Sequence, residues 1–303
     1  MRLILYAKSI HGKEDETVAS IKSKRNINGS VGGTVAVFFI LILFGIFMML
    51  PFVYSIVQSL KPPEELFRFP PRFFVTNPTL KNFKELFGLT NSLWVPFSRY
   101  VLNSFIITLV GTVGHVLLAS MAAFAIAKFP FPGSKIIFSI VVWSLLFTGD
   151  VTALPQYIVT AKLGLINTYW ALILPAVGGS LGFFLMKQFM EQVPGSIVES
   201  GTVDGANEFK IWWSIVLPIT KPAWLTLIIF SFQTLWNNSG DKYIYHEEMK
   251  TLPSVMSQIS ASGISRVGAA AAAAVILMIP PMVTFLISQR NVIETMAYSG
   301  IKE

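Results

Sequence analysis

The most distinctive chemical pattern of the chain lies in residues 199–218, which read ESGTVDGANEFKIWWSIVLP. The pair Asp204–Gly205 is a strong turn signal, and glycine tolerates the positive φ that a sharp corner requires. After the corner, apolar residues recur at helical spacing, which indicates one apolar helix face. They are Phe209, Trp212, Trp213, Val216 and Leu217. Residues of these types recognise another surface, so the segment is a candidate binding element rather than a catalytic one.

Two short helices are expected to meet at this corner. Ser196 and Glu199 have the spacing of a capping box, which predicts that the first helix begins at Ser196. We expect Asp204 to cap a second helix, which runs over about 206–216 and is ended by Pro218. An amphipathic helix of this kind either lies in the lipid interface or docks into a groove of a partner. The pattern alone does not decide between the two. We refer to residues 196–218 as the corner segment.

Several kinds of active site are excluded by residue type and spacing. The chain has no cysteine, which excludes disulfide bonds and thiolate catalysis. Its three histidines, His11, His115 and His246, are too far apart to show metal-ligand spacing. The sequence contains no G-x-x-x-x-G-K-[ST] loop to hold ATP phosphates, so we expect no cofactor on this chain. The absence of H-E-x-x-H and of paired aspartates in apolar stretches argues against a membrane-embedded enzyme.

The composition places the chain among membrane proteins. Hydrophobic residues make up 53% and charged residues 13%, with a mean hydropathy of +0.62. The net charge of +7 is better explained by lysine and arginine at membrane surfaces than by nucleic acid. Residues 1–30 mix both charges without an apolar core, so we expect a polar tail rather than a signal peptide.

Six stretches are long and apolar enough to cross a membrane. They are Gly32–Leu60, Tyr100–Ala127, Ser134–Leu154, Thr168–Met190, Ile219–Trp236 and Val267–Ser288. An even number places both termini on one side, and the distribution of lysine and arginine modestly favours the cytoplasm. The spans are almost free of charge, which argues against an ion-coupled pump. Breaks are predicted in two of the spans, in the fourth at Pro175 and Gly178–Gly179 and in the sixth at Pro280–Pro281. Each break either shapes a cavity or is a tolerated kink.

The predicted organisation is a cytoplasmic tail over 1–30, a transmembrane domain over 31–290 and a second cytoplasmic tail over 291–303. The corner segment is expected in the cytoplasm. Two long connections, 61–99 and 237–266, are expected outside. Long ordered loops are usually functional, and the alternative is a mobile surface loop.

The spacing E-x-x-x-x-x-G-x9-I-x-L-P at Glu199, Gly205, Ile215, Leu217 and Pro218 resembles the EAA motif of ABC-importer permeases. The two alanines of that motif are Ser200 and Gly201 here. Both are small, although glycine weakens a helix by up to about 1 kcal/mol relative to alanine. Residues 148–222 and the C-terminal NVIETMAYSGIKE resemble the carbohydrate-uptake branch, typified by the second permease subunit of the maltose importer.

The resemblance implies an all-α integral membrane protein with about six transmembrane helices in the type I ABC importer permease fold, and both termini in the cytoplasm. It implies a multi-pass subunit of the bacterial plasma (inner) membrane that serves an ATP-driven, binding-protein-dependent importer of sugars, in particular oligosaccharides. The implied partners are a second homologous permease, two ATP-binding subunits that hold ATP and magnesium, an extracellular or periplasmic sugar-binding protein, and membrane lipid. Nucleic acid is not among them.

The resemblance also assigns roles to residues. The corner segment would be the coupling helix seated on the ATPase subunit, with Glu199 facing a basic residue there and Leu217–Pro218 anchoring the segment to the fifth span. Residues 294–303 would approach the ATPase dimer interface. The ATPase-coupling residues implied are Glu199, Ser200, Gly201, Asp204, Gly205, Ala206, Asn207, Phe209, Leu217 and Pro218.

The connection at 237–266 would face the binding protein and help to release sugar from it. Aromatic faces cover the C–H surfaces of sugars, and amides hydrogen-bond their hydroxyl groups. Ordinary anchoring by Trp and Tyr at the membrane interface is the alternative for each residue. The implied substrate-path or binding-protein residues are Gln233, Trp236, Asn237, Asn238, Tyr243, Tyr245 and His246.

Two other functions stay open on the sequence. One is a permease subunit of an ABC importer for another solute, a peptide or an amino acid. The other is a membrane scaffold that binds an ATPase without transporting.

Overall fold

The computed structural model describes residues 31–91, 95–261, 263 and 266–299, and this part of the chain is helical with no β-strand. It divides into two compact units at Val53–Tyr54, a boundary that lies within helix α2 (Val31–Leu60). In the first unit, α2 exposes large apolar side chains, and its candidate span Gly32–Leu60 has a mean hydropathy of 2.8. Such a surface suits contact with lipid. The tail predicted over 1–30 lies outside the described residues.

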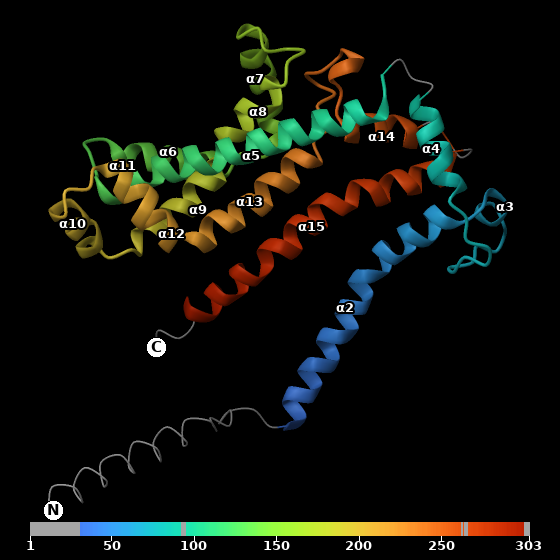
Figure 1. The fold of residues 1–303 in the computed structure, drawn as a ribbon, viewed down its shortest axis with the longest axis horizontal. Coiled ribbons are helices and arrows are strands. Elements are labelled where there is room, and N and C mark those ends of the chain that lie inside the picture. The colour runs from blue at the N-terminus through green and yellow to red at the C-terminus, as the bar shows by residue number, and fades with distance from the viewer. Residues whose placement is uncertain (1–30, 92–94, 262, 264–265, 300–303) are drawn as a thin grey trace, which may run out of the picture. The chain divides into compact units, whose positions relative to one another are not determined.

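The second unit begins at Tyr54 and contains the remaining helices (Figure 1). Its first half comprises α3 (Pro63–Leu66), α4 (Lys81–Asn91), α5 (Phe97–Lys128), α6 (Ser134–Ser144), α7 (Gly149–Lys162), α8 (Trp170–Val177) and α9 (Ser180–Glu191). Its second half comprises α10 (Gly195–Val203), α11 (Glu208–Ile211), the π-helix η2 (Trp212–Val216), α12 (Leu217–Ile219), α13 (Lys221–Trp236), the 3₁₀ turn η3 (Glu247–Met249), α14 (Leu252–Ala261) and α15 (Val267–Ser299).

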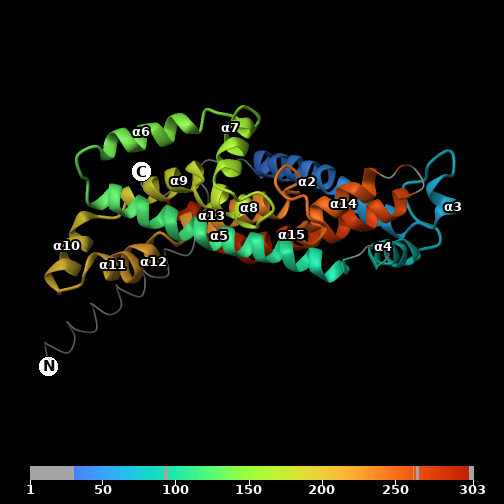
Figure 2. The ribbon, with the colours of Figure 1, turned by 90° about the horizontal axis from the view of Figure 1, so that it is seen from above.

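The long helix α5 is the axis of this second unit. It packs against α8, α9 and α13, and α13 in turn packs against α15. Small residues allow these close contacts, as expected for helices packed in a membrane. At Gly111, for example, a Cβ atom would lie 2.6 Å from Leu235 Cδ1. Helices α10 to α12 lie at one end of α5, and α4 and α14 lie at the other (Figures 1 and 2).

Four of the six predicted spans are supported as long apolar helices: Gly32–Leu60, Phe97–Lys128, Trp170–Glu191 and Val267–Gln289. Of the other two, Ser134–Leu154 contains a bend, and Ile219–Trp236 corresponds to α13, which is bent against the corner segment before it. Ser134–Ser144 and Gly149–Lys162 meet at 115°, and Glu208–Ile219 meets Lys221–Trp236 at 83°. At the first bend Thr148 adopts an extended conformation, with ψ 154°. Hydropathy averages over such a break, so composition did not reveal the bend at Thr148, whereas Pro218 predicted a helix end close to the second bend.

The two glycine and proline signals inside spans had different outcomes. The break at Gly178–Gly179 is confirmed, since α8 ends at Val177 and α9 begins at Ser180. At Pro280–Pro281 the helix is not interrupted, because α15 runs continuously through both prolines to Ser299, which agrees with the alternative of tolerated prolines. Part of the tail predicted over 291–303 therefore continues this helix.

A neighbouring helix supplies the donor that Pro281 lacks in α15. Pro281 has no N–H to offer the carbonyl of Leu277, four residues earlier. The indole N–H of Trp236, at the end of α13, donates to that carbonyl at 3.0 Å. Thr284 donates its hydroxyl to the Pro280 carbonyl at 2.9 Å. Satisfying backbone groups in this way is what permits proline inside a membrane helix.

Candidate functional site

The corner of the corner segment is a Schellman motif. Gly205 adopts φ +78°, the left-handed conformation expected for it. Its N–H donates to the Thr202 carbonyl and the Ala206 N–H donates to the Gly201 carbonyl, each at 3.0 Å. This pair of bonds ends an α-helix and satisfies carbonyls that have no partner within it. The corner therefore has a fixed backbone geometry, and that geometry depends on Gly205.

Both helix starts differ from the predictions. Helix α10 begins at Gly195 after Pro194, with no side-chain cap, so the capping box predicted for Ser196 and Glu199 is absent. Pro194 is the N-cap residue, with a non-helical ψ of 137°, and its ring offers no side-chain acceptor to the first turn. The second helix is capped by Asn207, whose Oδ1 accepts the Lys210 N–H at 2.8 Å. Asp204 instead ends α10.

The apolar stripe predicted along the second helix is split by the π-helix. Trp212 and Val216 are buried, at 3% and 0% exposure, but Phe209 and Trp213 are 61% and 52% exposed. Ile211, which the stripe omitted, is buried. A π-turn bonds each residue to the fifth one along rather than the fourth, and this shifts the phase of the following side chains. The sequence pattern assumes a uniform α-helical period and could not show the shift.

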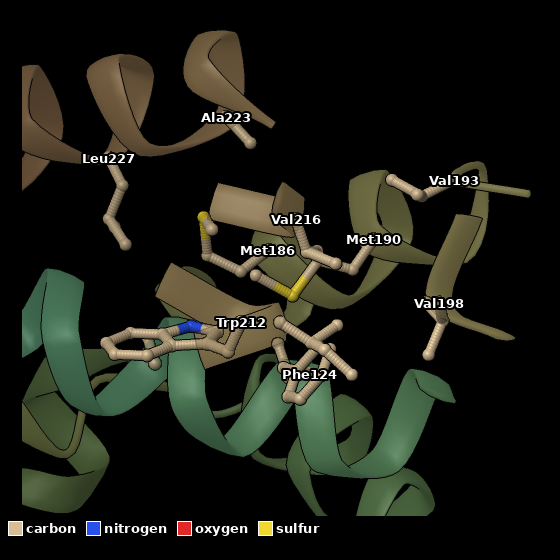
Figure 3. Packing of buried hydrophobic residues seen from close by; sticks show 12 residues of the cluster. Phe124, Met186, Met190, Val193, Val198, Trp212, Val216, Ala223 and Leu227 are labelled. Carbon is tan, nitrogen blue, oxygen red and sulfur yellow. The ribbon is translucent and has the colours of Figure 1, made fainter. Parts of the chain in front are cut away.

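Both arms of the corner segment are held in the hydrophobic core. Val198 from α10 and Trp212 and Val216 from the π-helix belong to one buried cluster with side chains of α5 and α9. Figure 3 shows Val216 beside Met186 and Met190 of α9, with Phe124 of α5 in the same cluster. Gly201 brings the arms together, because a Cβ there would lie only 3.0 Å from Ile215 Cδ1. The segment is therefore a rigid projection of the bundle.

The tip of the projection is exposed. Val203 is 86% exposed, and Glu199, Ser200, Asp204 and Asn207 are also exposed, whereas Ala206 is partly buried against the core cluster. Beside the tip lies a cavity of about 250 Å³ between α5 and α11. It is lined by Met121, Phe124, Ala125, Phe129, Glu208, Phe209 and Trp212.

The base of the corner segment is tied to the next helix. Trp224 of α13 donates its indole N–H to the Leu217 carbonyl at 3.1 Å. Pro218 was predicted to end the second helix, but the helical run continues to Ile219 and bends at Thr220. Proline is compatible with the first turn of α12, where it stands.

The opposite end of α5 carries the connection predicted over 237–266. Among the residues of this connection that the structure describes, 238–250 form a loop that includes η3, whereas α14 continues into the core, where Leu252, Val255 and Met256 are each 1% exposed. Burial explains the high apolar content of this half of the connection. The connection is therefore not a loop over 252–261, where it forms a buried helix.

The seven residues predicted for the substrate path do not form one surface. Trp236 is buried and bonded to α15, and Tyr243 is buried and stacked on Tyr157 with ring centroids 6.1 Å apart. Four are exposed: Asn237, Asn238, Tyr245 and His246. Gln233 and Asn238 take part in local turns, through the bonds Asn237 Nδ2 to Gln233 O (2.9 Å) and Gly240 N to Asn238 Oδ1 (3.0 Å).

The comparisons with known proteins agree with this architecture. No family model matches the chain. A chain in the crystal structure of a bacterial ABC transporter involved in the import of the acidic polysaccharide alginate is similar in fold, with a TM-score of 0.73 at 19% identity. The alignment covers 86% of this chain and 98% of that one.

Sequence comparison decides the family. Protein LplC of Bacillus subtilis is 32% identical over 217 residues, 70% of each chain. The polygalacturonan/rhamnogalacturonan transport system permease protein YtcP of the same organism is 30% identical over 216 residues, 70% of this chain and 72% of that one. This chain belongs to the carbohydrate-type ABC importer permeases. It is a multi-pass membrane protein and a transport subunit rather than an enzyme.

One local pattern in this ABC importer permease resembles a hydrolase motif without its geometry. Residues 178–182 read GGSLG and fit G-x-S-x-G, which requires a strand–turn–helix context. Here they join two helices. The Ser180 hydroxyl accepts from Ser144, and the His115 nitrogens contact Ser231 Oγ (2.8 Å) and the Gly179 carbonyl (3.1 Å). The Ser180–His115 pairing that nucleophilic catalysis needs is not among these contacts.

Sequence reasoning missed two asparagines of the permease that organise the 238–250 loop. Asn167 has φ +61°, and its side chain accepts N–H groups from that loop. Asn103, on α5, donates to carbonyls of the same loop. Asn167 is 78 and 79 positions from its partners in the sequence, and Asn103 is 145 and 147 positions from its partners. A local sequence pattern could therefore not connect them. Asn167 carried one weak signal, since it follows a Gly-Leu-Ile turn and asparagine tolerates positive φ.

Proposed function

We propose that this permease forms one half of the translocation path of an ATP-driven, binding-protein-dependent importer of oligosaccharides. The observation that carries the proposal is the exposed tip of the corner segment on a rigid, core-anchored base. A transport subunit without an ATP-binding loop needs such an element to receive force from a separate ATPase. The relative YtcP is named for transport of polygalacturonan and rhamnogalacturonan, which favours oligosaccharides as the solute class.

The proposed mechanism is a coupling between two sites through the helix bundle. When two ATPase subunits close on ATP and magnesium, they would move the tip of the corner segment. Because its arms are packed against α5, α9 and α13, the motion would pass to the bundle and switch it between inward-facing and outward-facing states. Without that packing the arms would bend and the motion would be lost.

We assign roles within the corner segment according to which of its side chains are exposed to solvent. Glu199, Ser200, Asp204, Asn207 and Phe209 face the ATPase, and Asn207 also caps the second helix. Gly201, Gly205 and Ala206 maintain the shape of the corner. Leu217 and Pro218 connect it to α13.

The proposed setting is the bacterial plasma (inner) membrane, with the corner segment and both termini in the cytoplasm. The partners are a second homologous permease, two ATP-binding subunits and an extracellular or periplasmic sugar-binding protein. The 238–250 loop lies at the opposite end of α5 from the corner segment, which suits contact with the binding protein (Figure 1).

Reconstitution tests this function. The chain would be assembled with its partner permease, ATPase subunits and binding protein in proteoliposomes, and uptake of labelled pectin-type oligosaccharides would be measured with and without internal ATP. We expect uptake that requires both ATP and the binding protein. Uptake of peptides instead of sugars, or ATP hydrolysis stimulated by the binding protein without uptake of any solute, would contradict the proposal. The second result would identify a scaffold.

A further inference from the structure

The 238–250 loop is fastened to the bundle by the side chain of Asn167. Its Oδ1 accepts the backbone N–H groups of Tyr245, at 2.6 Å, and His246, at 3.2 Å. The backbone N–H of Asn167 donates to the Tyr243 carbonyl at 2.9 Å. Asn167 makes these three bonds from a left-handed conformation, with φ +61°, that few residues other than glycine, asparagine and aspartate adopt readily.

A second asparagine fastens the next part of the loop by the opposite chemistry. Asn103, 1% exposed on α5, donates both amide hydrogens, to the carbonyls of Glu248 at 2.8 Å and Lys250 at 2.9 Å. The hydroxyl of Tyr169 donates to Asn103 Oδ1 at 2.7 Å and fixes which way the amide faces. Asn167 thus acts only as a side-chain acceptor toward the loop, whereas Asn103 acts as a donor.

These bonds restrict the backbone of residues 243–250. Some side chains of the same residues are nevertheless exposed to solvent. Tyr245 is 56% exposed and His246 is also exposed. Tyr243, in the same loop, is buried and stacked on Tyr157. The hydrogen bond with Tyr157 raises the pKa of Tyr245, and burial raises the pKa of Tyr243. A surface ordered before contact loses less conformational entropy on binding.

We propose that Asn167 and Asn103 are positioning residues that hold residues 243–250 in the conformation that receives the sugar-binding protein. The inference rests on the proposed function and adds to it how the contact surface is ordered. The two residues act through the loop backbone, without touching the partner. A mobile loop of the same sequence would bind the partner more weakly, although its exposed side chains would be unchanged.

The opposite chemistry of the two asparagines provides a matched test. Aspartate at 167 keeps the acceptor and tolerates the left-handed conformation, so Asn167→Asp is expected to behave as the wild type. Asn167→Gly keeps the conformation and removes the acceptor. Asn103→Asp removes both donors at an unchanged side-chain size. The same Asn-to-Asp substitution is therefore expected to be neutral at 167 and damaging at 103. Tyr169→Phe is a milder second variant, which frees the Asn103 amide to rotate.

The readout is ATP-driven uptake by the assembled transporter in proteoliposomes, as a function of binding-protein concentration. For Asn167→Gly we expect the half-saturating concentration to rise by about tenfold, with recovery in Asn167→Asp. Tyr169→Phe should shift it in the same direction. Hydrogen exchange over 243–250 should increase in the same variants. The variants are compared at equal amounts of assembled transporter. The amount is measured as the quantity of the two ATPase subunits that remain bound during purification.

Two results overturn the inference. One is an equal half-saturating concentration for Asn167→Gly and Asn167→Asp. The other is increased exchange over 243–250 with unchanged dependence on the binding protein, which would leave the asparagines with a structural role alone. In both cases the wild type still transports, so the proposed function stands. A wild-type complex whose uptake does not respond to the binding protein would instead refute the proposed function.

Discussion

The indole N–H of Trp236 donates to the carbonyl of Leu277 at 3.0 Å, across the interface between α13 and α15. That carbonyl is the one that Pro281 deprives of its helical donor. Trp236 is 2% exposed and stacks on Phe232, with ring centroids 5.9 Å apart. A tryptophan assigned to the substrate path on sequence grounds is thus placed where it completes the hydrogen bonding of a neighbouring helix.

The first prediction concerns this bond. Trp236→Phe removes the donor and leaves a buried carbonyl unpaired, at a cost of about 1–3 kcal/mol. In a Pro281→Ala background the helix regains its own N–H, so the same substitution should cost less. The measurement is thermal stability of the purified complex for both single variants and the double variant. Equal effects of Trp236→Phe in the two backgrounds would show that ring packing, rather than the hydrogen bond, is what matters.

The second prediction concerns the corner. Valine at 205 must adopt the left-handed conformation at a cost of about 1–2 kcal/mol or more, because it is β-branched. We expect Gly205→Val to insert in the membrane and to lose most ATP-driven uptake. Asparagine tolerates this conformation, so Gly205→Asn is the matched control and should retain more uptake. The measurement is uptake normalised to the amount of permease in the membrane. Wild-type uptake by Gly205→Val would remove the corner from the coupling mechanism.

The third prediction concerns Gly201, which stands where the EAA motif has alanine. A Cβ there lies 3.0 Å from Ile215 Cδ1 and 3.3 Å from Ile211 Cγ1, both on adaptable side chains. In Gly201→Ala, the strain of moving the two isoleucine side chains opposes a gain of up to about 1 kcal/mol in the helix propensity of α10. We expect Gly201→Ala to preserve uptake and thermal stability. Gly201→Leu should overpack the contact, at about 1–3 kcal/mol. Similar losses for Ala and Leu would mean that the two arms cannot adjust.

The fourth prediction concerns pH and the 61–99 connection. The Thr76 N–H, bonded at 3.0 Å, is the main cause that lowers the pKa of Glu65, and the Asn77 N–H, at 2.9 Å, adds to it. A carboxyl group with a lowered folded pKa stabilises the fold above its unfolded pKa, about 4.3, and this contribution is lost as pH falls through the folded value. Amide protection at 76 and 77 should therefore weaken in acid. In Glu65→Gln it should not depend on pH in that range. The same pH dependence in both proteins, measured by hydrogen exchange, would contradict this role.

How far the sequence predicts this molecule depends on the range of the interactions involved. The apolar stretches, the corner at Asp204–Gly205 and the break at Gly178–Gly179 are local signals, and the structure has each of them. The bend between α6 and α7 and the π-helix are departures from regular geometry that composition does not encode strongly.

The remaining differences involve contacts between distant parts of the chain. Helix α15 is continuous through its prolines, and Trp236 supplies a donor to it from another helix. Residues 252–261 read as loop because their partners on α5 and α15 are distant in sequence. A deletion of 240–262, which a loop assignment would suggest, would remove core residues such as Leu252 and Met256. Point substitutions in the 238–250 loop are the sounder test of its role.

The central claim, that the tip of the corner segment contacts an ATPase subunit, is tested most directly by cross-linking. The natural chain has no cysteine, so a single introduced thiol is unique in it. Val203→Cys, at a position 86% exposed on the tip, would be compared with Phe69→Cys, at a position 92% exposed in the 61–99 connection. With a short thiol-to-amine cross-linker applied to the assembled transporter, we predict a product between Val203→Cys and the ATP-binding subunit and none for Phe69→Cys. Cross-linking of Phe69→Cys to that subunit, with none for Val203→Cys, would contradict both the assignment and the orientation.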